Sequence, residues 1–344
     1  MLACLFSVMV SVLAIATPTD AVEYVFSIVT VDFPSFHDDL FDCLVTGIND
    51  AGSLVGGCND RSRDSDFRGF LYNGRRFRRI VLHTRPPRVD TANSTYRDET
   101  FDAVGSISVY QSMPLKKVGI LSAILDSQAR RVKRGVTPQS INNQDNITGW
   151  YSDGVRLNGF LTGRGKDRTL VVPGSMLTEA IGLNDFNQVV GDYTDEQGFF
   201  HGFVYDEGVY TSVDFPNLSQ ADSALSGINN FGEMVGCHST CTNGFHYDSE
   251  AATFTPIDFP GAVLTQPRDI NDSGLIVGVF SDGLELHGFL YDGIGFTVIQ
   301  APGAIVTNIF GVDNAGRIVG SYIVQASSGE LTHHAFLAVP VEQE

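Results

Sequence analysis

Aspartates recur at fixed positions of an internal repeat, and their carboxylates are the most regularly spaced reactive groups in the chain. One set lies twelve residues after the aliphatic residue that opens each repeat: Asp60, Asp153, Asp195 and Asp282. A second set lies in the turn just after that aliphatic residue: Asp50, Asp185 and Asp272. Carboxylate oxygens bind Ca²⁺, so the two sets could form two cation-binding faces, with the first set as the candidate metal site. The favoured alternative is turn chemistry without a cofactor, because Asp bonds its own backbone and the chain lacks EF-hand spacing.

Four cysteines remain once the amino-terminal segment that contains Cys4 is set aside. A hairpin that pairs Gly47 with Leu54 would place Cys43 opposite Cys58, within disulfide range. Cys237 and Cys241 flank a three-residue segment in the one repeat whose second loop is shortened. We therefore predict the disulfides Cys43–Cys58 and Cys237–Cys241, with free buried thiols as the alternative.

The sequence contains no recognisable catalytic constellation. It lacks a Gly-x-Ser-x-Gly elbow, an HExxH motif, a phosphate-binding loop and a spaced acid pair, so no catalytic residue is assigned. Several of the eight histidines share one repeat column, which favours packing on a strand surface over a zinc site. Propeller enzymes can use scattered loop residues, so these absences favour a binding protein without excluding an enzyme.

The elements that would position these residues belong to a repeat of about 42 residues. Six copies begin with an aliphatic residue and a polar pair; the last five are 42, 45, 42 and 42 residues apart. Four places after the aliphatic residue only Gly, Asn or Asp occurs, which indicates a hairpin turn with a left-handed residue. The six copies start at Ile48, Ile141, Leu183, Ile228, Ile270 and Val312.

Each copy reads as four short strands. A glycine inside the second strand, such as Gly191, indicates close backbone approach. The third strand carries a Gly-Phe or Ala-Phe pair whose Phe should be core, and the fourth ends in a proline turn such as Phe215-Pro216. Four strands in about 42 residues predict one blade of an all-β propeller, with residues 24–340 forming a single domain.

The two chain ends predict how the ring closes. The sixth copy stops after its third strand, and residues 26–34 match the missing fourth strand. An amino-terminal strand that completes the last blade would leave no long free edge. The interval from Ile48 to Ile141 holds 93 residues, so residues 83–135 are a basic insertion, a degenerate seventh blade, or a frame or splice error. We expect six blades, with seven as the alternative.

The combined pattern resembles the extracellular HAF repeat family. The motif for which the family is named occurs as His334-Ala335-Phe336, and His201-Gly202-Phe203 and His287-Gly288-Phe289 are similar. Arg68, Asn158 and Asn243 stand where His would in the remaining copies. The resemblance covers residues 47–72 and 137–340; it implies a secreted propeller-type protein and assigns no activity.

The first residues and the charge distribution bear on location and partners. Residues 1–16 read as a signal peptide that ends in Ala14-Ile15-Ala16, although no Lys or Arg precedes the apolar run; a short buried strand is the alternative. No later stretch has the ~20 apolar residues of a membrane span. The 344 residues carry a net charge of −18, but residues 61–134 hold 16 of the 22 Lys and Arg against 7 acids, or +9. The remainder is −27, which argues against nucleic acid as a partner of the repeats.

Taken together, these features predict a secreted or extracellular protein, with the periplasm as the alternative compartment. We expect a monomeric, non-enzymatic binding module for carbohydrate or protein. Two alternatives remain: a hydrolase or lyase with a metal-assisted site in the central channel, and a structural exoprotein.

Overall fold

The described part of the chain is built from β-strands and turns and contains no helix. The computed structural model describes residues 8–10, 26–31, 40–60, 66–80, 82, 135–163, 166–216, 218 and 222–341. The predicted insertion at 83–135 lies outside these residues except for Gly135. Within the described residues, no helix is long and apolar enough to cross a membrane.

Four sheets have four strands each, in which neighbours in the chain pair side by side. The first consists of β3 (Leu40–Ile48), β4 (Leu54–Asp60), β5 (Asp66–Tyr72) and β6 (Phe77–Arg79). The second consists of β7 (Val136–Ile141), β8 (Ile147–Ser152), β9 (Leu157–Gly163) and β10 (Lys166–Leu170). The third consists of β11 (Leu177–Leu183), β12 (Val189–Thr194), β13 (Phe200–Asp206) and β14 (Val209–Val213). The fourth consists of β15 (Ser223–Ile228), β16 (Glu233–His238), β17 (Asn243–Asp248) and β18 (Thr253–Ile257).

The remaining nine strands form one sheet with two parts. One part consists of β19 (Leu264–Ile270), β20 (Ile276–Ser281), β21 (Leu286–Tyr291) and β22 (Phe296–Ile299). The other consists of β23 (Ala304–Val312), β24 (Ile318–Gln325), β25 (Leu331–Pro340), β2 (Phe26–Val31) and β1 (Val8–Val10). A single parallel pair, Leu286 with Val306, connects the two parts.

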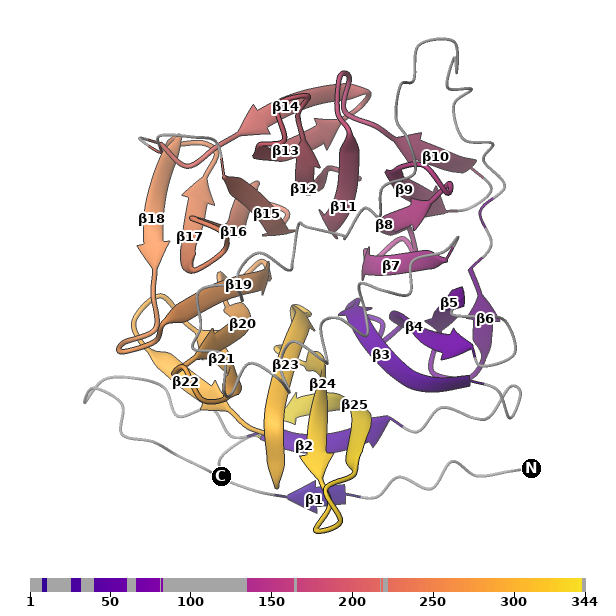
Figure 1. Ribbon diagram of the computed structural model, residues 1–344, viewed down its shortest axis with the longest axis vertical. Coiled ribbons are helices and arrows are strands. Elements are labelled where there is room, and N and C mark those ends of the chain that lie inside the picture. The colour runs from indigo at the N-terminus through magenta and orange to yellow at the C-terminus, as the bar shows by residue number, and fades with distance from the viewer. Residues whose placement is uncertain are drawn as a thin grey trace.

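The sheets are arranged around a central axis, with the first strand of each four-stranded group nearest the centre (Figure 1). This radial arrangement of four-stranded antiparallel sheets defines a β-propeller. Strand β2 pairs with β25 from Phe26↔Pro340 to Val31↔Ala335. Strand β1, which falls within the predicted signal peptide, pairs with the other edge of β2. Removal of a signal peptide stays a prediction.

The core confirms the expected role of the repeated phenylalanine. The phenylalanine of the third strand is fully buried in five copies, and in the sixth copy, where it is Phe70, it is 7% exposed. The five are Phe160, Phe203, Phe245, Phe289 and Phe336. Each packs in a cluster with aliphatic residues of neighbouring strands; Phe203, for example, packs with Leu170, which comes from the preceding sheet.

The strand-interior glycines are also explained. A Cβ on Gly191 would overlap the carbonyl oxygen of Glu179 on the paired strand and would lie 3.0 Å from the Phe203 ring. The equivalent glycine of every other copy meets a carbonyl oxygen and a phenylalanine ring in the same way. Glycine is therefore needed there because the carbonyl of the first strand and the phenylalanine ring of the third leave no room for a Cβ, next to a β-bulge between Ala180 and Gly182.

The hairpin that carries the first disulfide has a register different from the one predicted. Gly47 pairs with Val55, and it is Ile48 that pairs with Leu54. A bulge between Val45 and Gly47 then shifts the register by one residue, so that Val45 pairs with Gly56 as expected. The prediction for the hairpin end was therefore wrong, because it took no account of the bulge, but the predicted disulfide forms.

Candidate functional site

Both predicted disulfides are present. Cys43 and Cys58 join β3 to β4 with a Cα–Cα distance of 4.0 Å. Cys237 and Cys241 close the short loop between β16 and β17 with a Cα–Cα distance of 4.7 Å. The two bonds belong to different sheets.

The predicted metal-binding aspartates each organise a separate turn. Asp153 accepts hydrogen bonds from the amides of Val155 and Arg156, both at 2.8 Å. Asp195 and Asp282 each accept two amide bonds in the same way within their own turns. The bond from the Glu285 amide is the largest of the effects that lower the pKa of Asp282.

These bonds are the turn chemistry that the sequence favoured. Asp60 ends β4, and its side chain lies outside the described part of the structure. No group of three or more metal-ligating side chains occurs among the residues described. A Ca²⁺ site in this set stays a prediction.

The other end of the first strands brings polar residues of all six copies together. The first polar residue of each turn accepts a hydrogen bond from the backbone amide four positions later, at 2.8 to 3.0 Å. In five copies its side-chain amide also donates to the backbone carbonyl of the next copy's turn, at 2.9 to 3.2 Å. We call this set the inner ring: Asn49, Asn142, Asn184, Asn229, Asn271 and Asp313.

The sixth member of the inner ring departs from the rule and is compensated. Asp313 has no amide to donate, and its side chain is fully buried. Arg317 bonds the Asp313 carboxylate through Nε at 2.5 Å. Its Nη2 donates to the carbonyls of Asn49, at 3.3 Å, and Asp50, at 2.9 Å. Arg317 thus makes the connection that an asparagine amide makes in the other copies.

The second polar residues form another closed circuit, in which Asp and Asn alternate. We call it the outer ring: Asp50, Asn143, Asp185, Asn230, Asp272 and Asn314. Every backbone amide in it donates to the side-chain oxygen of the next member at 2.8 to 2.9 Å. Every asparagine Nδ2 donates to the Oδ2 atoms of both flanking aspartates at 2.7 to 3.0 Å.

This arrangement determines what the outer ring can bind. Both hydrogens of each asparagine amide are already used, so the ring offers no free side-chain donor. Each aspartate Oδ1 accepts one backbone bond and retains a second lone pair. The outer ring therefore presents acceptor atoms and three carboxylates, which complement ammonium, guanidinium or hydroxyl donors.

A cavity and two exposed aromatic rings complete this candidate site, which we call the mouth. The cavity, of about 60 Å³, is lined by both rings and lies where the first strands end. Phe186 and Phe231 directly follow the hydrogen-bonded neighbours Asp185 and Asn230. Their side chains are 67% and 71% exposed, although their backbone amides are held by the inner ring. The mouth thus combines carboxylates with two phenylalanines that are exposed in the same turns.

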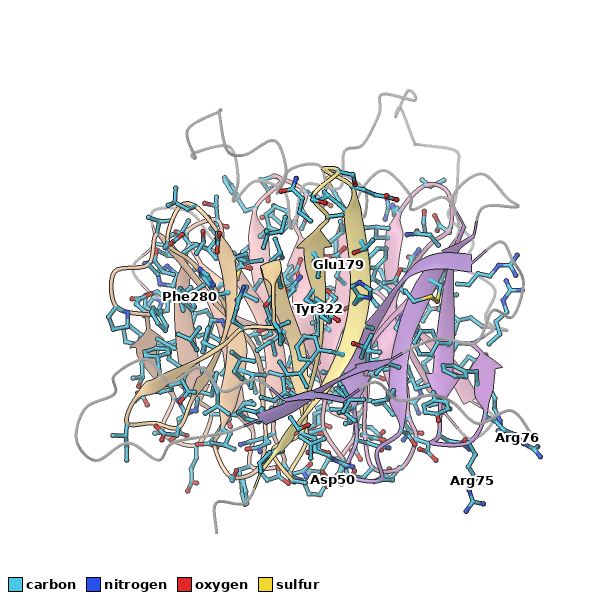
Figure 2. The ribbon with its side chains drawn as sticks, turned by 90° about the horizontal axis from the view of Figure 1, so that it is seen from below. Asp50, Arg75, Arg76, Glu179, Phe280 and Tyr322 are labelled. Carbon is cyan, nitrogen blue, oxygen red and sulfur yellow. A yellow bond between two sulfur atoms is a disulfide. The ribbon has the colours of Figure 1, made fainter. Side chains whose placement is uncertain are left out.

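A second group of carboxyls lies inside the propeller. Glu179 of β11 pairs directly with Asp192 of β12. In Figure 2, Asp50 lies at one end of the propeller, and Glu179 lies well away from that end. Burial raises the pKa of Glu179 to about 7. Burial, and then the charge of Glu179, raise the pKa of Asp192, whose side chain is 5% exposed. One oxygen of Asp192, Oδ2, has no hydrogen-bond partner. Such a pair can hold a proton near neutral pH.

The repeated histidines stack on aromatic residues of the paired strand. His201 lies on Tyr193, with ring centroids 5.0 Å apart, and its Nδ1 is 2.9 Å from Asp214. The same cross-strand stacking joins His287 to Phe280 and His334 to Tyr322. This matches the packing interpretation of the histidine column.

The fold and the mouth define the class: an all-β propeller with a polar, aromatic-flanked opening on its axis. No family model and no curated protein matches the chain. Among solved structures, virginiamycin B lyase from Staphylococcus aureus is similar over 94% of this chain and 90% of its own, at 11% identity and a TM-score of 0.42. A fucose-specific lectin from Aleuria aurantia is similar over 88% and 97%, at 12% identity and a TM-score of 0.43.

Sequence reasoning singled out one set of aspartates as a site, whereas the structure brings the other set together. The pattern places Asp50, Asp185 and Asp272 on a possible second cation-binding face, but it does not show that they join in one hydrogen-bonded ring. It does not single out Phe186, Phe231 or the Glu179–Asp192 pair. A signal is present, because a phenylalanine in a tight polar turn and an acid inside a first strand both depart from the repeat.

Proposed function

We propose that this protein is an extracellular binding module whose partner, a carbohydrate or a protein, is held at the mouth. The observation that carries the proposal is the outer ring: three carboxylates with all side-chain donors committed, beside two exposed phenylalanines. Aromatic faces bind the apolar faces of sugars or peptide side chains, and the carboxylates accept bonds from their donors. The partner group is therefore rich in hydroxyl donors or carries an ammonium or guanidinium group.

The proposal includes a single six-bladed propeller closed by β2, in which the last blade is completed from the amino terminus. Two observations support this count. The outer ring passes through six copies and returns from Asn314 to Asp50. Asn49 donates directly to Asn142, so the first two sheets are adjacent at the axis. Deleting residues 23–34 should abolish cooperative unfolding, and a deletant that melts like the parent would contradict closure by β2.

Location and family are part of the same proposal. Two disulfides are consistent with an oxidising compartment outside the cytoplasm. We assign the repeat to the HAF type and expect a monomer. Nucleic acid is not expected at the mouth, because the aspartate carboxylates repel phosphate.

The test is an array of neutral, amino-containing and acidic glycans together with cationic peptides. We expect selective binding that falls about tenfold or more in F186S/F231S, since interface aromatics dominate binding energy. The matched control is V155S/L284S, which removes two exposed apolar side chains from turns at the opposite ends of the strands. Binding that is lost only in the control variant, or that is unchanged in F186S/F231S, would contradict the proposed site.

A second candidate function is a hydrolase or lyase that acts in the central channel. It is favoured by Glu179, whose pKa of about 7 suits a general acid or base. Turnover of ester, amide or glycoside substrates that disappears in E179Q, with unchanged folding, would support it. A Ca²⁺-dependent rise in melting temperature that is absent from D153N/D195N/D282N would assign a metal to the predicted aspartate set.

A further inference from the structure

The hairpin between β5 and β6 displays an unusual concentration of positive charge. Arg75, Arg76, Arg78 and Arg79 are all exposed, within five consecutive positions. None of these guanidinium groups forms an ion pair with any residue that the structure describes. Figure 2 shows Arg75 and Arg76 extending away from the body, at the end that also carries Asp50. We call residues 73–79 the arginine hairpin.

The backbone beneath these arginines is well fixed. The side chain of Asn73 accepts hydrogen bonds from the amides of Arg75, at 3.3 Å, and Arg76, at 3.0 Å. Gly74 takes the left-handed conformation that the turn requires, with φ of 78°. The Phe77 ring stacks on Tyr72 with centroids 4.3 Å apart. The hairpin therefore presents its charges from a rigid base, which lowers the entropic cost of binding.

The same hairpin in another copy shows that the fold does not require arginine there. Between β21 and β22, Asp292 accepts hydrogen bonds from the amides of Ile294 and Gly295, and the Phe296 ring packs against Tyr291 with centroids 4.7 Å apart and planes tilted by 36°. The positions equivalent to the four arginines are occupied by Ile294, Gly295, Thr297 and Val298. The turn and the aromatic contact are thus kept without arginine. The second copy has basic residues at two of the equivalent positions, Lys166 and Arg168, so it is the run of four arginines that is specific to the first copy.

We propose that the arginine hairpin binds acidic polysaccharide through the carboxylate or sulfate groups of its sugars. Arginine matches planar anions with two parallel hydrogen bonds, and all four charges here are arginines. Side chains alternate along a strand, so Arg78 projects to the side opposite Arg79 and both sides of the hairpin carry charge. A flexible linear polyanion can contact both sides.

Other anionic partners fit the hairpin less well. Its aromatic side chains, Tyr72 and Phe77, are partly buried and stacked on each other, so they offer no platform for nucleic-acid bases. No exposed large hydrophobic side chain lies within the described residues of this hairpin to insert into a lipid bilayer. The hairpin is also separate from the mouth, so this inference stands apart from the function proposed there.

The experiment measures binding of the full chain to immobilised polygalacturonate and heparin in increasing salt. We expect salt-sensitive binding that falls about tenfold or more in R75S/R78S, because each contact between an arginine and an anionic group of the polysaccharide adds to the salt-dependent affinity. The matched control is I294E/T297E in the equivalent hairpin, which changes the net charge equally. Circular dichroism of both variants should be unchanged.

Three results would overturn the proposal. One is polysaccharide binding that R75S/R78S retains in full, which would place the binding elsewhere in the chain. Another is an equal loss in I294E/T297E, which would show an effect of net charge alone. The third is tighter binding to duplex DNA or to vesicles rich in phosphatidylserine, which would assign a different partner class.

Discussion

Replacing Arg317 with alanine should destabilise the propeller at the point where its last copy meets its first. Asp313 is fully buried and Arg317 is 25% exposed, so the variant leaves a buried carboxylate without its partner. Removing one partner of a buried pair costs about 3 to 5 kcal/mol, and the partial exposure of Arg317 favours the lower figure. The carbonyls of Asn49 and Asp50 also lose a donor. We expect a loss of about 3 kcal/mol in the free energy of unfolding.

The double variant D313N/R317A separates this explanation from a general loss of stability. The D313N change would restore the side-chain amide that the other five copies use, as Asn271 does at 2.9 Å from the carbonyl of Asp313. The double variant should therefore recover roughly half or more of the lost stability. Urea unfolding followed by the fluorescence of Trp150, the single tryptophan, provides the measurement, with R156S as a surface control. A loss below about 1 kcal/mol in R317A, or a double variant less stable than R317A, would refute the reasoning.

Three further predictions concern the repeat, the interior carboxyls and the disulfides. G191A should lower the free energy of unfolding by about 2 kcal/mol or more, because its Cβ overlaps the Glu179 carbonyl. G311A should lower it much less, because its Cβ would meet its nearest atom at 3.4 Å. Equal losses of stability in thermal melting would count against close backbone approach at Gly191. Burial raises the pKa of Glu179 from 4.5 to about 7, so the folded state holds the proton more tightly and the unfolding free energy should fall as the pH rises from 4.5 through 7. Urea titrations across this range should show a shallower fall in E179Q, and an identical pH profile would be contrary to the assignment. C43S/C58S opens a loop of 15 residues and should lower the free energy of unfolding by about 3 kcal/mol. C237S/C241S, with a separation of four residues, should lower it by about 2 kcal/mol. Chemical unfolding that gives the reverse order would contradict this prediction.

The repeat made most of the fold predictable from sequence. Residues four places after each aliphatic residue do take positive φ, from 59° at Asp145 to 78° at Gly232, because a hairpin turn needs a left-handed residue there. The buried phenylalanines and the crowded glycines follow from the same periodicity. The register near Gly47 was missed because a bulge leaves no mark in the hydrophobic pattern.

The candidate site was less predictable, since it depends on contacts between copies. The spacing shows that Asp50 and Asn143 occupy equivalent turns, but not that each bonds its neighbour. The same holds for Arg317, whose role is visible only because Asp313 replaces the asparagine of the other copies. Single-sequence patterns describe one repeat at a time, whereas the mouth is made by all six together.

The most direct test of the proposed function is a crystal structure of the full chain with the strongest ligand from the array. We predict that the ligand lies over the mouth, with donor groups on Asp50, Asp185 or Asp272 and an apolar face on Phe186 or Phe231. A ligand bound instead at the opposite turns, around Asp153, Asp195 and Asp282, would contradict the account.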